Sequence, residues 1–434
     1  MRTRIPLGTG ALICGALVVL LYYLSKKLQG GITTVDPWGA SSHNSFKAER
    51  YEGFSLADDE FADMDPQSAR IVFYIMISGW KELAGLDAIF DTLYHTDHLF
   101  LLHMDVQAHE NARNQVERRI SQVLMQHGNG RTNIRLVHPS MPVTWGGFTM
   151  TLSAVYGLAQ ALHWTSKWDY FINLSASDLP LITADEMSHI LGEHKAHNTS
   201  FIKGFLYQPS WEGFTFVDRR EMFSEDVSLM SIDEREKKWP WAILDKDKNM
   251  LMRPQPELFT VYKGEFWVTL HRNMALYIHK SPDNMARMLL GYFSGMMVSD
   301  EEFFQTVACN PHFPGDKLKT HGDNLRFVNW WGGGASPSAI TPARAVAAAN
   351  SGAMFGRKFV SMTEEGRDGI KWIQDYLANP ARSKFRVERV KRRLAERMGP
   401  GGEPQSFCGK KQERHPPEAY FATEGEEEKL PGAK

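Results

Sequence analysis

The sequence predicts an α/β domain in which helices flank a mostly parallel sheet, with a transmembrane helix ahead of that domain. From residue 71 onward, short apolar runs alternate with longer segments whose apolar residues recur every three or four positions. Strands joined by helices produce this alternation. Nearer the amino terminus, residues 5–24 carry no charge, and about 20 such residues span a bilayer.

The predicted transmembrane helix lies between "MRTR" and "SKK". No small-residue cleavage pattern follows it, which favours an uncleaved signal anchor over a removed signal peptide. The basic residues on its two flanks nearly balance and only weakly favour a cytosolic amino terminus. We expect a cytosolic tail at 1–4, the anchor at 5–24 and a stem at 25–67, where Gly, Ser, Asp and Glu are typical of a linker.

One large domain is predicted for residues 68–390. Its first strand, 71–77, is almost continuously apolar, which suits a strand with both faces covered. A helix follows, because apolar residues recur at helical spacing from Leu83 to Leu93. The further predicted strands are 98–105, 133–139, 170–175 and 265–272, and the further predicted helices are 109–127, 152–162 and 274–279.

Two less regular regions complete the chain. Residues 205–260 are rich in Trp, Pro and charge, which is typical of loops that frame a cleft. A basic run, "KFRVERVKRRLAERM", predicts a solvated helix face rather than a binding site. Beyond it the chain is Gly- and Pro-rich and then acidic, so we expect a disordered tail over 391–434.

Composition excludes some functions and leaves others open. Lys and Arg total 49 against 51 Asp and Glu, so no overall field attracts nucleic acid. No Walker loop, HExxH, GxSxG or paired CxxC motif occurs, which excludes several large enzyme classes. Besides Cys14 in the apolar segment, the cysteines are Cys309 in a predicted helix and Cys408 in the polar tail. Their pairing stays open, and we expect little structural dependence on disulfides.

In the stretch "WDYFINLSASDLPL", an apolar run typical of a buried strand is followed directly by Ser, Asp and Pro. Pro180 and the residues before it favour a turn, which places Ser175, Ser177 and Asp178 at the carboxyl end of the strand. Ligands bind at this edge of open α/β sheets. The alternative is a turn whose polar side chains cap the next helix.

Six stretches follow one another in order over roughly residues 70 to 360: "LYHTDHLFLLHMD", "WGGFTMTLSAVYGLAQAL", "WDYFINLSASDLPL", "DEEFFQTVACN", "DNLRFVNW" and "FGRKF". Together they resemble one family of glycosyltransferases. The family includes the core-2 β-1,6-N-acetylglucosaminyltransferases, the peptide O-xylosyltransferases and the plant arabinogalactan glucuronosyltransferases. The resemblance implies a GT-A-like fold, a single-pass type II Golgi membrane protein with a lumenal catalytic domain, a UDP-sugar donor, and inversion without an essential metal.

The resemblance assigns the central chemical roles. An inverting transfer needs a base for the proton of the acceptor hydroxyl, and Glu301 matches the family's catalytic glutamate. Its neighbours Asp300 and Glu302 leave another interpretation open, because an acidic triplet at a helix start complements the helix dipole; Glu302 is the alternative base. Arg357 and Lys358 match the family's basic pair, which meets the charge of the departing diphosphate.

The remaining site residues also follow from the resemblance. Asp105 is expected near the uridine or ribose of the donor. Trp145, Gly146 and Gly147 form the next donor-binding element, where glycines permit close backbone approach. Packing is an alternative role for Trp145.

Ser177 and Asp178 are expected to shape the cleft between donor and acceptor. Relatives often carry Gly-Ser-x-Trp where this chain has Gly264, Glu265, Phe266 and Trp267, so contacts from this segment differ. Glu265 and Trp267 remain candidates for acceptor contact.

The predicted function is therefore metal-independent, inverting transfer of a sugar from a UDP donor to a hydroxyl on a protein or glycan. The donor sugar does not follow from the resemblance, because small pocket differences decide it. No cofactor is required, although Mn or Mg is not excluded. One alternative is a metal-dependent transferase that uses Asp245 and Asp247; the other is an inactive, membrane-tethered binding protein with the same fold.

Overall fold

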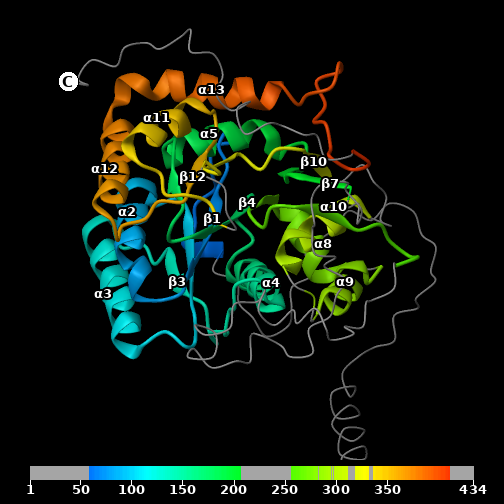
Figure 1. Ribbon diagram of the computed structural model, residues 1–434, viewed down its shortest axis with the longest axis horizontal. Helices are drawn as coiled ribbons and strands as arrows, with labels where there is room; N and C mark the ends of the chain where they lie inside the picture. The colour runs from blue at the N-terminus through cyan, green and yellow to red at the C-terminus, as the bar shows by residue number, and fades with distance from the viewer. Residues whose placement is uncertain are drawn as a thin grey trace, which may run out of the picture. The chain divides into compact units, whose positions relative to one another are not determined.

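A central β-sheet organises the part of the chain that our computed structural model describes, which is residues 58–206, 256–310 and 318–410 apart from 282, 295, 297 and 332–335. Within these residues the sheet has seven strands in the order β10-β6-β9-β4-β1-β2-β3 (Figure 1). The neighbours of β9 are antiparallel to it, and the other pairs are parallel. The strands are β1 (Ile71–Ile77), β2 (Leu99–Met104), β3 (Ile134–Leu136), β4 (Tyr170–Ser175), β6 (Thr199–Phe201), β9 (Thr269–His271) and β10 (Lys319–His321).

The predicted mostly parallel sheet is thus confirmed, and its first strand is covered on both faces. Alternate residues of β1 enter different apolar clusters: Phe73 and Ile75 belong to one, and Val72 and Tyr74 belong to the other. Because side chains alternate along a strand, an uninterrupted apolar strand requires helices on both faces. The helices are α2 (Leu83–Leu93), α3 (Glu110–His127), α4 (Phe148–Trp164), α5 (Ala184–Lys195), α8 (Arg272–Lys280), α9 (Met285–Phe293), α10 (Phe303–Cys309), α11 (Pro342–Asn350), α12 (Glu364–Ala378) and α13 (Ser383–Ala395).

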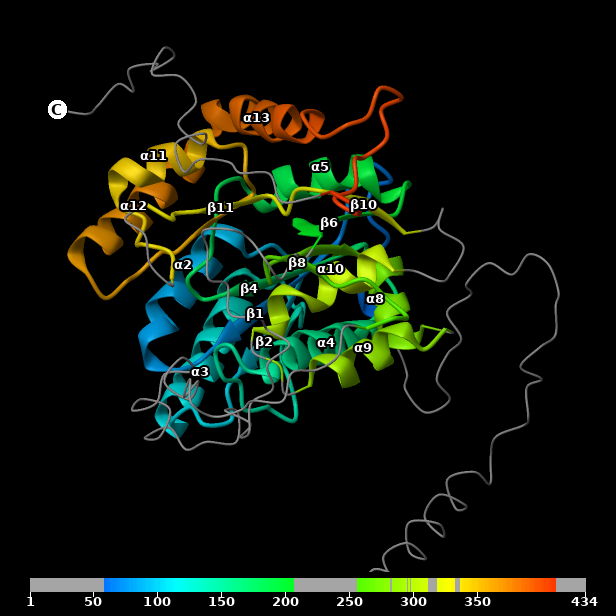
Figure 2. The ribbon, with the colours of Figure 1, turned by 45° about the vertical axis from the view of Figure 1, so that its right-hand side comes forward.

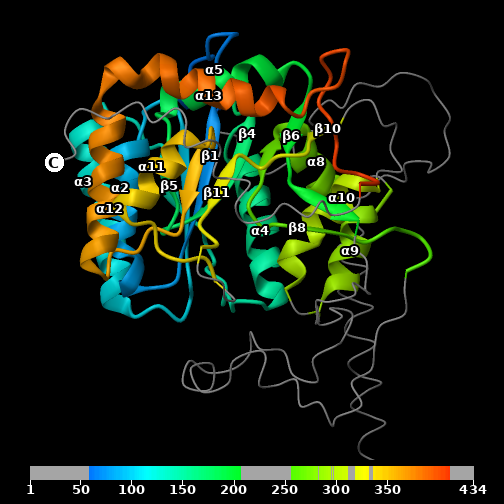
Figure 3. The same cartoon turned by 45° about the horizontal axis from the view of Figure 1, so that its top comes forward.

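The helices divide between the two faces of the sheet. Helices α2, α3 and α12 lie on one side of β1, and α4, α8 and α9 lie on the other, in both Figure 1 and Figure 3. Helix α13 runs along α5 (Figure 2), and Arg386 of α13 forms a buried ion pair with Glu186 of α5 at 2.8 Å. The basic run is therefore a packed helix as well as a charged one.

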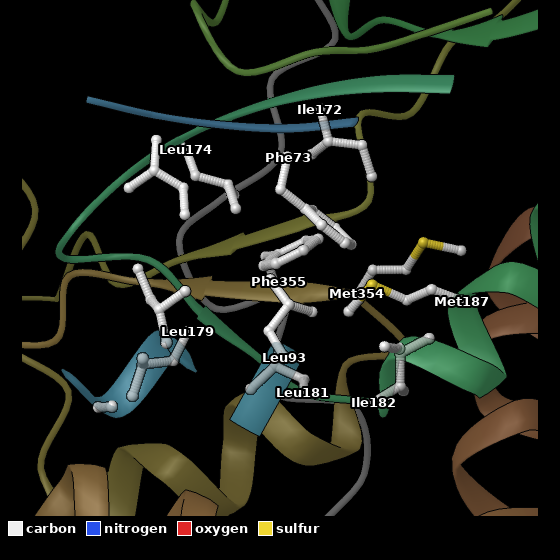
Figure 4. Close-up of a cluster of buried hydrophobic side chains, with 14 of the residues drawn as sticks. Phe73, Leu93, Ile172, Leu174, Leu179, Leu181, Ile182, Met187, Met354 and Phe355 are labelled. Atoms are coloured by element: carbon white, nitrogen blue, oxygen red, sulfur yellow. The ribbon is translucent and has the colours of Figure 1, made fainter. Parts of the chain in front are cut away.

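A small second sheet carries one of the predicted site residues. Strands β11 (Arg326–Val328), β12 (Phe355–Arg357) and β5 (Leu179–Pro180) pair side by side. Figure 4 shows Phe355 of β12 pointing toward Phe73 of β1, with ring centroids 6.4 Å apart. This apolar contact fixes the small sheet against the central one.

An antiparallel ribbon of β7 (Gly204–Leu206) and β8 (Tyr262–Gly264) lies beside α10. A methyl group at Gly264 would come 2.0 Å from the carbonyl oxygen of Lys203. Glycine is needed there because the two strands approach this closely. Most of the irregular region predicted at 205–260 lies outside the described residues.

The predicted disorder from residue 391 is wrong for 391–410. Helix α13 continues to Ala395, and the chain beyond it packs back onto the domain. Phe407 is 2% exposed, and the amide of Leu206 donates to the carbonyl of Lys410 at 2.8 Å. The glycine and proline content of this segment suggested disorder. The segment is ordered because the buried ring of Phe407 and one cross-link fix it to the domain.

That cross-link is a disulfide between Cys309 and Cys408. It ties the end of α10 to the C-terminal segment, so the pairing that the sequence left open is made in the structure. Sequence could not decide the pairing, because the two cysteines are 99 residues apart and only the fold of the C-terminal segment brings them together.

We predict that Cys408→Ser lowers the free energy of unfolding by about 2–5 kcal/mol, because the bond closes a long loop in the unfolded chain. Thermal unfolding with and without dithiothreitol measures this. The parent should lose stability on reduction and the variant should not respond. Equal unfolding temperatures for parent and variant would contradict a structural role for the bond.

The stem predicted for 25–67 ends earlier than expected. Phe61 is 2% exposed within the core, and the carboxylate of Asp58 accepts hydrogen bonds from Thr165 and Ser166, each 2.6 Å long. These contacts make residues 58–67 part of the domain. All described residues fall in one unit, Ser55–Lys434.

Among the described residues, no helix has the length and apolar character needed to cross a bilayer. The anchor predicted at 5–24 lies outside those residues. Its existence stays a prediction.

Candidate functional site

The acidic triplet has one accessible carboxylate. A short 3-10 helix, Ser299–Glu301, precedes α10. The side chain of Glu301 is 35% exposed, whereas Asp300 and Glu302 are 5% and 1% exposed. A base must reach a substrate, and Glu301 is the member of the triplet placed to do so.

The turn that contains "WGG" holds the segment that carries Glu301. The amide of Val298 donates to the carbonyl of Gly146 at 2.8 Å, and the hydroxyls of Thr151 and Ser299 lie 3.3 Å apart. Gly146 has φ 74°, a conformation that favours glycine. Val298 has φ 54°, which is rare for a β-branched residue and occurs three residues before the carboxylate.

Lys263 of β8 supplies a cation beside that carboxylate. Its Nζ lies 3.6 Å from Oε2 of Glu301, and the residue is 9% exposed. The ribbon, the "WGG" turn and the 3-10 helix therefore meet around Glu301.

Glu265 follows β8, and its carboxylate is engaged inside the protein. Lys203 approaches Oε1 at 2.7 Å, and the amide nitrogen of Asn324 donates to Oε2 at 2.8 Å. Burial alone would raise the pKa of Glu265, but the charge and hydrogen bond of Lys203, with the hydrogen bond of Asn324, outweigh burial and lower it. The acceptor contact predicted for Glu265 would require sharing this carboxylate with internal partners.

Arg357 ends β12 and is held from two directions. Its Nη1 lies 3.2 Å from both carboxylate oxygens of Asp178, and its Cζ lies 4.0 Å from the ring centroid of Trp267. In the described residues, the hydrogen bonds of this guanidinium use Nη1 alone. Trp267 was expected at the acceptor; the structure places its ring against Arg357.

Asp178 is completely buried. Its Oδ2 also accepts hydrogen bonds from the amide and the hydroxyl of Ser175, at 2.7 and 2.6 Å. The residue thus forms the predicted turn and also anchors Arg357. The amide of Phe359 donates to the carbonyl of Ser177 at 2.9 Å, which brings Ser177 next to Lys358.

Glu82 lies in the same neighbourhood and was missed by sequence reasoning. Burial raises its pKa and Asp178 adds to the rise, while hydrogen bonds from Ser78 and the charge of Lys358 oppose it. The available signal was its position just after β1, in "SGWKE", at an edge where ligands bind in such sheets.

Asp105 follows β2, as predicted, and organises the loop beside it. Its Oδ1 accepts from the amide of Gln107 at 2.8 Å, and its Oδ2 accepts from the amide of Val143 at 2.9 Å. The carboxylate therefore shapes the segment that leads into Trp145. Its predicted contact with the donor stays a prediction.

Partly exposed tryptophans also lie near strand ends and near the "WGG" turn. Sequence reasoning singled out Trp145, whose exposure is 46%. Others that follow β1 and β11 were missed, because a tryptophan count does not separate exposed rings from core ones. They are Trp80, Trp330 and Trp331, at 47%, 50% and 54%.

One segment joins the two halves of this site. Lys263 contacts Glu301, and Trp267 contacts Arg357. Four residues of chain extend at most about 14 Å. The accessible carboxylate and the guanidinium are thus linked through one short stretch of backbone.

A metal site is not found in the part of the chain that the structure describes: no three His, Cys, Asp or Glu side chains group to hold an ion there. Asp245 and Asp247, the alternative metal ligands, lie outside the described residues. Metal dependence stays a question for experiment.

A family model described as "Branch: Core-2/I-Branching enzyme" matches residues 71–351. The chain belongs to the Core-2/I-branching enzyme family. The predicted resemblance is confirmed, and the match includes Asp105, the "WGG" turn and Glu301. It ends before Arg357 and Lys358, so the role of the basic pair stays a prediction.

Curated proteins similar to this Core-2/I-branching chain are named as xylosyltransferases or as glucuronosyltransferases. Xylosyltransferase 1 of Rattus norvegicus is 27% identical over 275 residues, which are 63% of this chain and 29% of the relative. Beta-glucuronosyltransferase GlcAT14A of Arabidopsis thaliana is 27% identical over 272 residues, 62% of this chain and 56% of the relative. The chain thus spans well under two thirds of the length of either relative.

A solved structure, that of mouse xyloside xylosyltransferase 1 in its apo form, matches with 13% identity and a TM-score of 0.30. The match covers 60% of this chain and 89% of that chain. A TM-score this low does not establish a common fold. The fold of this Core-2/I-branching protein rests on its own sheet topology.

Proposed function

We propose that this protein is an inverting glycosyltransferase of GT-A-like fold that transfers a sugar from a UDP-sugar to a hydroxyl on a protein or glycan. Membership of the Core-2/I-branching family and relatives named for xylosyl and glucuronosyl transfer support the reaction class. The observation that carries the proposal is the accessible carboxylate of Glu301, placed between the "WGG" turn and the segment that also contacts Arg357.

In the proposed reaction, Glu301 takes the proton of the acceptor hydroxyl while the hydroxyl oxygen attacks the anomeric carbon of the donor sugar. A new carbon–oxygen bond forms on the face opposite the leaving group, which inverts the configuration. The bond from the anomeric carbon to the diphosphate oxygen breaks, and its electron pair leaves on UDP.

Arg357 and Lys358 are proposed to stabilise that leaving charge. A guanidinium fixed in advance costs little reorganisation when charge develops, and this is the usual basis of electrostatic catalysis. Nη1 of Arg357 is committed to Asp178, so the opposite edge of the fork is the one offered to diphosphate oxygens. The exposed tryptophans at the strand ends supply flat apolar faces for the acceptor.

We also propose a single-pass type II Golgi membrane protein with a lumenal domain. The uncharged segment at 5–24 suits a signal anchor, and the Cys309–Cys408 disulfide suits an oxidising compartment.

The donor and the metal requirement are tested together by UDP release from the full-length protein. We expect release with one of UDP-xylose, UDP-N-acetylglucosamine and UDP-glucuronic acid, in the presence of an acceptor, that persists in excess EDTA. Fixed cations at the diphosphate make a divalent ion unnecessary in this mechanism. Loss of release in EDTA and its return with Mn²⁺ would favour the metal-dependent alternative through Asp245 and Asp247.

The binding-protein alternative gives a different result in the same assay. UDP binding without release, across donors and a panel of protein and glycan acceptors, would replace the proposed transferase with a binding protein of the same fold.

A further inference from the structure

Arg326 is a buried cation behind the site that the proposed mechanism does not use. It opens β11, next to β12, where it pairs with Phe355 while Val328 pairs with Arg357. The residue is 4% exposed. Its Cζ lies 4.4 Å from the ring centroid of Phe355, and its Nη2 donates to the backbone carbonyl of Asn173 at 3.1 Å.

The rest of its guanidinium is not satisfied. Nε and Nη1 are buried and have no hydrogen-bond acceptor within the described structure. Unpaired buried donors and a buried charge both destabilise a fold. Buried polar groups that are left unsatisfied are expected mainly at functional sites.

Arg326 nevertheless stays charged at neutral pH. Burial lowers its pKa to about 10, with Arg357 also lowering it, while Asp178 and Glu265 raise it. Asp178, the ion-pair partner of Arg357, therefore also acts on Arg326.

The balance of charge explains what this cation contributes. Arg357 and its fully buried partner Asp178 together carry no net charge, so this pair alone would attract a diphosphate weakly. Glu265 adds a second carboxylate, which Lys203 contacts at 2.7 Å. Arg326 lies on the strand that pairs with the strand of Arg357, and its amide donates to the side chain of Asn324, which in turn donates to Glu265. Its buried charge acts on both carboxylates, which raise its pKa, and the low dielectric there strengthens that field.

We propose that Arg326 is a positioning residue for the leaving group: its buried charge offsets Asp178 and Glu265, so that Arg357 keeps a net positive field at the diphosphate. The inference rests on the proposed UDP-sugar site and adds a residue that need not touch the donor. It acts through Arg357, and its charge matters more than its hydrogen-bonding fork.

The test compares UDP with UMP, since only UDP carries the second phosphate of the leaving group. Calorimetry on the full-length parent protein should show tighter binding of UDP than of UMP, and the ratio of the two affinities is the preference measured here. In Arg326→Gln we expect this preference to fall about tenfold, with UMP affinity unchanged. Arg326→Lys, which keeps the charge without the fork, should restore most of the preference.

Arg386→Gln is the matched control, because Arg386 is also buried, at 2% exposed, and pairs with Glu186 on the α5–α13 contact. It should lower the unfolding temperature and leave the UDP preference intact. An unchanged preference in Arg326→Gln, or a Lys variant as weak as the Gln variant, would overturn the inference. A parent that binds neither nucleotide would instead overturn the proposed donor, and the inference with it.

Discussion

Replacing Glu301 by Gln is expected to reduce the rate of sugar transfer by about a hundredfold to ten-thousandfold, the usual contribution of a positioned base. UDP affinity should change little, because the amide keeps the shape of the side chain and the proposed base acts on the acceptor hydroxyl rather than on the donor. Single-turnover transfer, together with calorimetric UDP binding, separates the two effects.

The matched control is Glu302→Gln, one residue further along. Glu302 is 1% exposed, so its replacement should affect the unfolding temperature more than the chemical step. If Glu302→Gln stopped transfer while Glu301→Gln turned over at the parent rate, the base would be reassigned to Glu302. If both variants transferred normally, the proposed base mechanism would fail.

Replacing Arg357 by Met is expected to have two separable consequences. Loss of a fixed cation at the leaving group should lower the transfer rate by about a hundredfold to a thousandfold. Loss of the partner of a fully buried carboxylate should lower the free energy of unfolding by about 3–5 kcal/mol. Transfer kinetics and denaturant unfolding of the same preparation measure the two.

The double variant Arg357→Met with Asp178→Asn separates these effects. Neutralising Asp178 removes the unpaired buried charge, so stability should return toward that of the parent. Transfer should stay low, because the cation is still missing. Recovery of transfer along with stability would mean that Arg357 acts only through folding, which would contradict its role at the diphosphate.

Local pattern predicted much of the fold because the relevant signals are short. The apolar run at 71–77 and the strand at 170–175 read directly as buried strands, and both lie in the parallel part of the sheet. The tail was misjudged for the opposite reason. Its order depends on Phe407 and Cys408 meeting partners far away in the chain, and composition contains no information about such partners.

The candidate site divides in the same way. The acidic triplet and the basic pair were visible as residue types, and their resemblance to a known family suggested roles. Three features could not be predicted from the sequence: the contact of Trp267 with Arg357, the ion pair of Glu265 with Lys203, and the burial of the charged Arg326. Each depends on segments that only the packed sheet brings together.

By itself, the sequence determined the alternation of strands and helices, the polar residues at the carboxyl ends of the strands, and the family. These follow from local periodicity, turn chemistry and ordered motifs. Tertiary structure alone decided which carboxylate of the triplet is accessible, and which carboxylate holds Arg357. Asp178 and Arg357 are 179 residues apart, and exposure and pairing at that separation are set by how helices and sheets pack, which no short stretch of sequence encodes.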